Sequence, residues 1–120
     1  MAFDALTVAH HLVRSLRAPL VALRRHDRSL HKQLREAGTS VPLNVAEGNR
    51  RRGGDRTYHF RVAAGSADET RQILLTAVSL GYLDESVVAD ALGFADRECA
   101  ILWRLTERKS PPSIAATSSS

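Results

Sequence analysis

Residues 84–105 read DESVVADALGFADRECAILWRL, and their apolar positions recur every three or four residues. This spacing places the apolar side chains on one face of an α-helix, and Asp84 is well suited to cap its first turn. The stripe is unbroken for about five turns, which is typical of a long helix packed against others. Its members are Val88, Ala91, Leu92, Ala95, Cys99, Leu102 and Leu105.

A second long helix precedes this segment. Gly53-Gly54 indicates a turn, and Asp55 behind it is a suitable N-cap. Gly81 ends the helix, and Tyr82 stands where a hydrophobic contact usually follows a glycine C-cap. Small or apolar residues mark its buried face at positions 60, 63, 64, 67, 74, 77 and 78.

The first half of the chain predicts two more helices. The first spans residues 4–17, and the second starts at or soon after Pro19 because proline disfavours helix at the residue before it. Residues 38–42, Gly-Thr-Ser-Val-Pro, leave two alternatives. Either the second helix breaks there, which local propensity favours, or one kinked helix continues to about Arg51.

Length and composition agree with a single helical domain. The chain has 120 residues, and Ala, Leu and Arg occupy 47 of them, which argues against a β-sandwich or barrel. No apolar run approaches the roughly 20 residues of a membrane span, and no secretory signal pattern opens the sequence. The single cysteine suggests a reducing, cytoplasmic location. We therefore expect an all-α fold, an antiparallel up-down four-helix bundle over residues 1–109, with a disordered tail at 110–120.

Positive charge is concentrated in the first half. Residues 1–56 carry a net charge of +6 and residues 57–120 a net charge of −2. A basic half suggests an anionic partner, most commonly nucleic acid, although a solvated face or a favourable helix C-terminus would also explain it. The candidate phosphate-binding residues lie on the basic side of the second helix and in the corner that follows it, and they are Arg24, Arg25, Arg28 and Lys32 on the helix and Arg50, Arg51, Arg52 and Arg56 in the corner.

Signals for catalysis or a bound metal are weak. The five histidines include no pair with metal-binding spacing, so no metal or other cofactor is expected. Cys99 lies within an apolar stripe and is expected to be a small buried side chain. Glu47 pairs best with Arg51 at i+4, and Gly65-Ser66 is expected to permit close helix packing. Only Glu47 or Glu69 could serve an enzyme, and no enzymatic activity is expected.

Three segments resemble one family. Residues 40–48 (SVPLNVAEG), 60–69 (FRVAAGSADE) and 77–83 (AVSLGYL) resemble the "four helix bundle" or 23S rRNA intervening-sequence proteins. The resemblance implies an up-down four-helix bundle whose signature helix continues through the proline. It also implies structural or interhelical roles for the matching residues, which are Ser40, Pro42, Asn44, Glu47, Gly48, Gly65, Ser66, Glu69, Gly81 and Tyr82.

The accessory variability determinant proteins of diversity-generating retroelements are similar in fold. They are basic pentamers that bind nucleic acid and associate with a reverse transcriptase. We therefore expect a non-enzymatic homo-oligomer, with a homopentamer as the expected form, that holds RNA or DNA backbone, with no membrane or small-molecule substrate. The alternative is an accessory subunit that binds a protein, such as a reverse transcriptase, and has no affinity of its own for nucleic acid.

Overall fold

The computed structural model describes residues 2–107, and these form an all-α fold without strands. Five helices follow one another: α1 (Ala2–Ser15), α2 (Arg17–His26), α3 (Arg28–Arg50), α4 (Gly53–Ser79) and α5 (Glu85–Glu107). The all-α prediction is confirmed. The tail predicted to be disordered, residues 110–120, lies outside the described residues.

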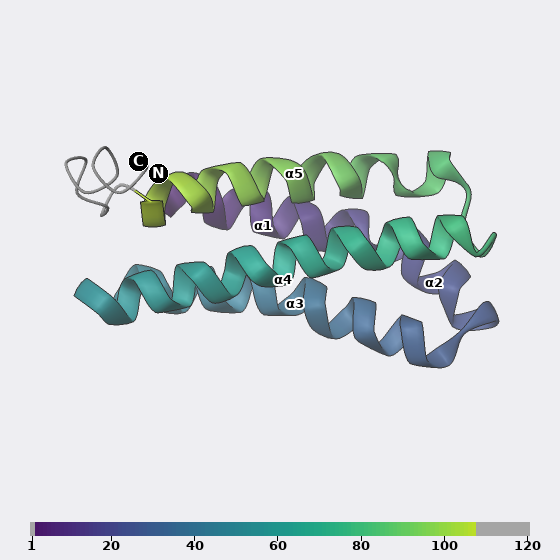
Figure 1. Ribbon diagram of the computed structural model, residues 1–120, viewed down its shortest axis with the longest axis horizontal. Helices are drawn as coiled ribbons and strands as arrows, with labels where there is room; N and C mark the ends of the chain where they lie inside the picture. The colour runs from purple at the N-terminus through teal and green to yellow at the C-terminus, as the bar shows by residue number, and fades with distance from the viewer. Residues whose placement is uncertain (1, 108–120) are drawn as a thin grey trace, which may run out of the picture.

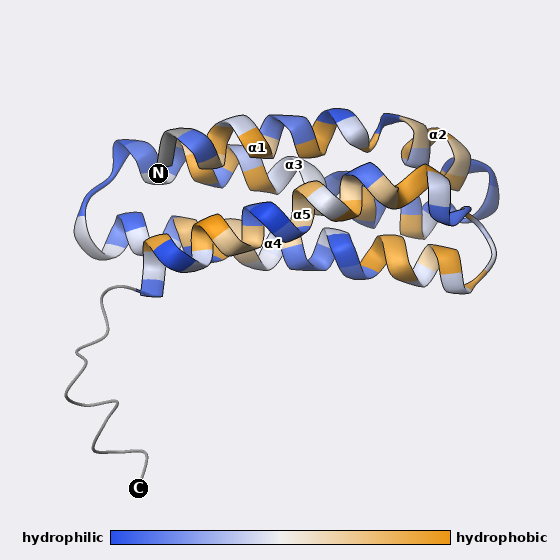
Figure 2. Ribbon diagram, turned by 90° about the horizontal axis from the view of Figure 1, so that it is seen from above, coloured by the Kyte–Doolittle hydropathy of each residue, from blue (hydrophilic) through white to orange (hydrophobic). Residues whose placement is uncertain are grey.

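Four of the helices lie side by side along the long axis, and α2 lies at one end (Figure 1). Helix α3 packs against α4, α4 against α5, and α1 against both α5 and α3. Figure 2 shows apolar and hydrophilic residues alternating along the helices, as amphipathic helices require. The apolar faces meet in a core that includes Leu12, Leu34, Leu74 and Leu102, all fully buried.

The predicted second helix is wrong at Asp27, where the structure divides it into α2 and α3. Asp27 has an extended backbone, with φ −157° and ψ 101°, and its side chain accepts a hydrogen bond from the Leu30 amide at 2.9 Å. Aspartate is among the best N-cap residues because it satisfies an amide that no helical carbonyl can reach. This cap starts a new helix and turns the chain. The predicted first helix also ends earlier, at Ser15.

Helix α3 continues without a break through Gly38 and Pro42. This confirms the continuous helix that the family resemblance implies, against the local preference for a break. Both residues are buried, and a Cβ at Gly38 would collide with Leu16, the residue between α1 and α2. Burial of this face therefore offsets the hydrogen bond that the proline cannot donate.

Helices α3 and α4 approach each other closely at two points. A Cβ on Gly48 would lie 2.5 Å from Cε1 of Phe60, so only glycine fits. Two turns away, the hydroxyl of Ser66 donates to the hydroxyl of Ser40 at 2.8 Å. The predicted close approach is correct for Ser66 and wrong for Gly65, which is exposed and has nothing within 4 Å of a Cβ.

The end of α4 matches the prediction, and its beginning does not. Gly81 has φ +79°, its amide donates to Val78, and the Tyr82 amide donates to Ala77, both at 2.9 Å. These bonds form a Schellman C-cap. Asp55, predicted as the N-cap, lies inside the first turn, because α4 already begins at Gly53, which adopts φ +58°.

No helix within residues 2–107 is both long enough and apolar enough to cross a membrane.

The contact at Gly48 predicts opposite effects for two glycine substitutions. Gly48→Ala should lower the free energy of unfolding by about 1–3 kcal/mol, because the new methyl group forces Phe60 from its position. Gly65→Ala is the matched control, and it should raise stability by about 0.5–1 kcal/mol through helix propensity alone. Urea denaturation measures both, and equal effects would contradict the close approach.

Candidate nucleic-acid interface

Four of the predicted phosphate-binding residues surround the junction between α2 and α3. Arg24 and Arg25 occupy the last turn of α2, and Arg28 and Lys32 lie in the first two turns of α3. All four are exposed, and none forms an ion pair with another described residue. We call these four residues the junction cluster.

Specific contacts hold this junction in place. The Nδ1–H of His31 in α3 donates to the carbonyl of Leu20 in α2 at 2.9 Å. The ring of His26 stacks on that of Tyr82, with 5.2 Å between centroids and 9° between planes. The junction cluster is therefore carried by a fixed corner rather than a free loop.

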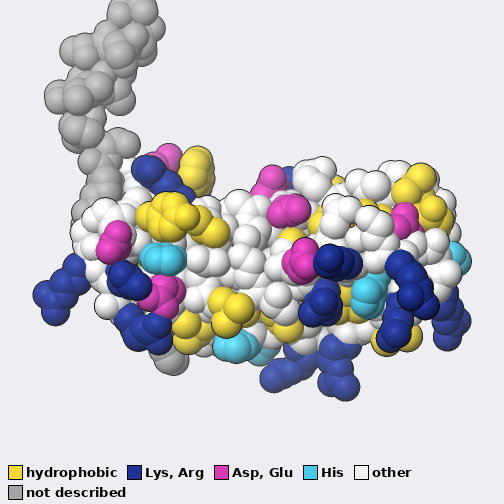
Figure 3. Space-filling view, turned by 90° about the horizontal axis from the view of Figure 1, so that it is seen from below, with side chains coloured by type: hydrophobic (Ala, Val, Ile, Leu, Met, Phe, Trp, Pro, Cys, Tyr) yellow, Lys and Arg dark blue, Asp and Glu magenta, His cyan; other side chains and the backbone are white. Residues whose placement is uncertain are grey.

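The other four predicted residues lie at the opposite end of α3. About 33 Å of helix axis separates Arg28 from Arg50. Figure 3 shows Lys and Arg side chains over the right half of one face and a separate group at its left end. The candidate phosphate-binding residues therefore form two groups at opposite ends of α3. We call Arg50, Arg51, Arg52 and Arg56 the α3–α4 corner.

Two of the four arginines in the α3–α4 corner are already ion-paired. Arg50 and Arg51 both form ion pairs with Glu47, and Arg51 also reaches Asp55 at 3.5 Å. The hydrogen bond from Arg51 (2.8 Å) is the main cause that lowers the pKa of Glu47. The predicted Glu47–Arg51 pair is confirmed.

Arg56 also serves the fold. It donates to the Gly48 carbonyl at 3.3 Å, and its guanidinium lies over the Phe60 ring, 4.8 Å from the centroid. Within residues 2–107, Arg52 is then the one member of the corner whose side chain forms no ion pair or hydrogen bond. This corner has less charge to offer a phosphate backbone than its composition suggests.

Several family-motif residues form a hydrogen-bonded chain between α3 and α4. The Asn44 side-chain amide donates to the hydroxyl of Ser40 at 3.0 Å and to its carbonyl at 2.9 Å. Because the amide nitrogen is the donor there, the Asn44 oxygen accepts the Nδ1–H of His59 at 3.0 Å. Ser66 completes the chain through Ser40. These contacts join two helices.

Sequence analysis missed His59, which lies 15 residues from Asn44 and carries no local signal of that pairing. Glu69 was predicted to be structural, but it is exposed and its side chain forms no hydrogen bond or ion pair with the described residues.

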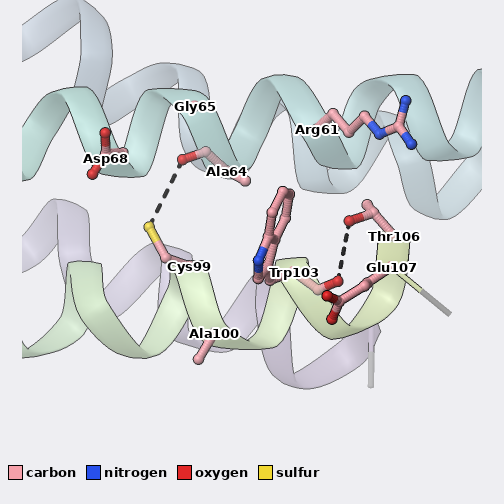
Figure 4. A pocket seen from close by; sticks show the side chains of 9 residues that line it. All are labelled: Arg61, Ala64, Gly65, Asp68, Cys99, Ala100, Trp103, Thr106 and Glu107. Carbon is pink, nitrogen blue, oxygen red and sulfur yellow. Dashed lines mark hydrogen bonds between the residues drawn. The ribbon is translucent and has the colours of Figure 1, made fainter. Parts of the chain in front are cut away.

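A groove of about 840 Å³ runs between α4 and α5 (Figure 4). Gly65 and Cys99 lie on its two sides, and the exposed ring of Trp103 stands within it. The Cys99 thiol is half-buried and donates to the Ala64 carbonyl at 3.8 Å. Burial is the main cause that raises its pKa, so the thiol remains protonated and is a poor nucleophile.

A second groove, of about 470 Å³, lies between α1 and α5. Arg97 and Arg104 line it from α5, and Asp4 and His11 line it from α1. The sequence analysis did not single out these arginines, because no local run of charge marks them. Within residues 2–107 no three His, Cys, Asp or Glu side chains gather as a metal site would require.

Comparison with known proteins gives one match. The model of the family described as "23S rRNA-intervening sequence protein" matches residues 3–104. Neither the curated proteins nor the solved structures contain a match.

The chain of hydrogen bonds predicts a specific cost for losing Asn44. Asn44→Ala should lower the free energy of unfolding by about 1–2 kcal/mol, because it leaves the His59 and Ser40 groups without their partner. Asn49→Ala is the matched control on the same helix, where the side chain is exposed, and it should change stability by less than about 0.5 kcal/mol. Equal losses in urea denaturation would argue against the network.

Proposed function

The chain belongs to the 23S rRNA-intervening sequence protein family, and on this basis we propose that it is a non-enzymatic protein that binds the RNA backbone through the junction cluster. The observation that carries the proposal is the exposure of four unpaired cations at one rigid corner. The family name refers to ribosomal RNA, which favours RNA over DNA as the partner.

The chemistry of the junction cluster suits phosphate rather than bases. Three of its members are arginines, whose planar guanidinium groups bind phosphate through two parallel hydrogen bonds. The α3 N-terminus lies among them, and its amide groups also favour anions. The recognition is therefore electrostatic and largely independent of sequence.

The rest of the proposal concerns assembly. We propose that α1, α3, α4 and α5 act as an antiparallel up-down four-helix bundle, with α2 as a short addition, and that copies associate, a pentamer being the expected form. Large apolar side chains on the outside support association, including Val21, Leu43 and Tyr58, each more than 60% exposed.

The absence of enzymatic activity is part of the proposal. Glu47, an acid within the family motif, is held by two arginines and its pKa is lowered, which makes it a poor proton donor. Glu69, the other candidate, lies alone on the surface.

A second candidate function is that of an accessory subunit for another protein, such as a reverse transcriptase. The observation that favours it is the α4–α5 groove, in which the Trp103 ring is 59% exposed. Exposed tryptophan is common at the centre of protein interfaces.

The salt dependence of binding tests which basic group contacts RNA. With a short labelled single-stranded RNA, the triple variant Arg24→Ala/Arg25→Ala/Arg28→Ala should reduce the slope of log K against log salt by about 2 units, because each phosphate contact contributes about 0.7. The matched variant Arg50→Ala/Arg51→Ala/Arg52→Ala removes the same charge and should reduce it by less than about 1 unit, since Glu47 already holds two of those arginines. A larger reduction of the slope in the Arg50→Ala/Arg51→Ala/Arg52→Ala variant would instead place the interface at the α3–α4 corner. No binding by the wild type would favour the protein-partner function.

The mass of the purified protein tests the proposed assembly. Light scattering after nuclease treatment should give a particle of several copies of the 13.1 kDa chain, with five as the expected number. The ratio of absorbance at 260 and 280 nm before treatment reports any RNA that copurifies. A monomeric mass would refute self-association and leave the RNA-binding proposal to the salt experiment.

A further inference from the structure

Glu98 is a carboxylic acid enclosed in the interior of the helices. Its side chain belongs to α5, and 0% of the residue surface is exposed. Neither Oε1 nor Oε2 has a hydrogen-bond partner among the described residues. An ionised carboxylate in such a place would lose its hydration without gaining a cation or a donor, so the neutral form is strongly favoured.

The helical register explains why this acid points inward. Glu98 lies three residues after Ala95 and four before Leu102, and both of those residues are fully buried. It therefore occupies an inward position of the α5 stripe, where an apolar residue would be expected. The spacing alone could have identified it, because a single acid at a stripe position is visible in the sequence.

The surroundings of Glu98 supply no compensating charge. The other buried polar residues of the described chain are Thr70 and Thr106, whose hydroxyls donate to their own helices. Burial is the cause that raises the pKa of Glu98 to about 8. The charged and titratable groups of the helices around it are exposed or partly exposed, and they include Asp4, His10, His11 and Arg14 on α1, His26 on α2, Glu36 and Glu47 on α3, His59, Arg61, Asp68, Glu69 and Arg71 on α4, and Asp96, Arg97, Cys99 and Arg104 on α5.

Helix α5 has a groove on each side of this position. Arg97, the residue before Glu98, lines the groove shared with α1, and Cys99, the residue after it, lines the groove shared with α4 (Figure 4). Each neighbour of the buried acid thus borders an open groove. A small displacement of α5 would bring water to the carboxyl group.

We propose that Glu98 makes the packing of α5 proton-dependent: its neutral form keeps α5 packed against α1 and α4, and its ionised form loosens α5 so that water reaches the carboxylate. The device lies in the fold itself and does not depend on the RNA-binding proposal. The protonation of Glu98 sets the range of pH over which α5 remains packed against α1 and α4.

The direction of the effect follows from linkage. The carboxyl group of Glu98 binds its proton more tightly when α5 is packed than when α5 is loosened. The packed state is therefore fully stabilised at and below a pH of about 4.5, the ordinary glutamate value. This stabilisation decreases as pH rises from there to about 8, and above that pH it stays constant. Between pH 6 and pH 8 the equilibrium constant for opening should rise up to about fiftyfold.

Hydrogen exchange of the α5 amides tests the proposal. Glu98→Gln keeps the shape of the neutral acid and cannot ionise, so its α5 opening equilibrium should be nearly equal at pH 6 and pH 8. Comparing wild type and variant at the same pH cancels the intrinsic pH dependence of exchange. Relative to this variant, wild-type α5 should exchange up to about fiftyfold faster at pH 8 than at pH 6. Glu69→Gln, which removes an exposed acid, should behave as wild type.

A titration of the wild-type protein alone can also overturn the proposal. The side-chain carboxyl carbon of Glu98, followed by NMR, should titrate near pH 8. A midpoint near 4.5, or wild-type and Glu98→Gln proteins with the same ratio of α5 exchange between the two pH values, would refute it. The NMR titration remains decisive if the variant does not fold.

Discussion

The close approach of α3 to α4 is the constraint on which the remaining structure depends. Gly48 leaves room for the ring of Phe60, and the hydroxyls of Ser40 and Ser66 meet at 2.8 Å. At each point of contact at least one of the two residues is small, because two bulky side chains would not fit between helices this near to each other. The register of α3 against α4 then fixes where His59 meets Asn44 and where Arg56 reaches the Gly48 carbonyl.

The basic residues at the two ends of α3 differ in their contacts. At the α3–α4 corner, Glu47 holds Arg50 and Arg51, so their positive charge stabilises the end of α3. At the other end of α3, the Asp27 cap turns the chain and leaves the junction cluster exposed. Charge that looks alike in composition is therefore structural in one place and available to a phosphate backbone in the other.

The interior of the molecule is not uniformly apolar. Glu98 is fully buried in α5 and neither carboxyl oxygen has a hydrogen-bond partner among the described residues, so an apolar residue of similar size would give a more stable core. The residues on either side of it, Arg97 and Cys99, line the two grooves beside α5.

The sequence by itself determined the helical class, the stripe of α5 and the glycine cap at Gly81, because each depends on spacing or backbone freedom within a few residues. It also gave the Glu47–Arg51 pair, whose members are four residues apart on one helix. Tertiary structure alone decided the continuity of α3 through Pro42, the roles of Gly48 and His59, and the separation of the two basic groups. These features depend on contacts between residues far apart in the chain, and the burial of whole helix faces outweighs the local preferences at each position.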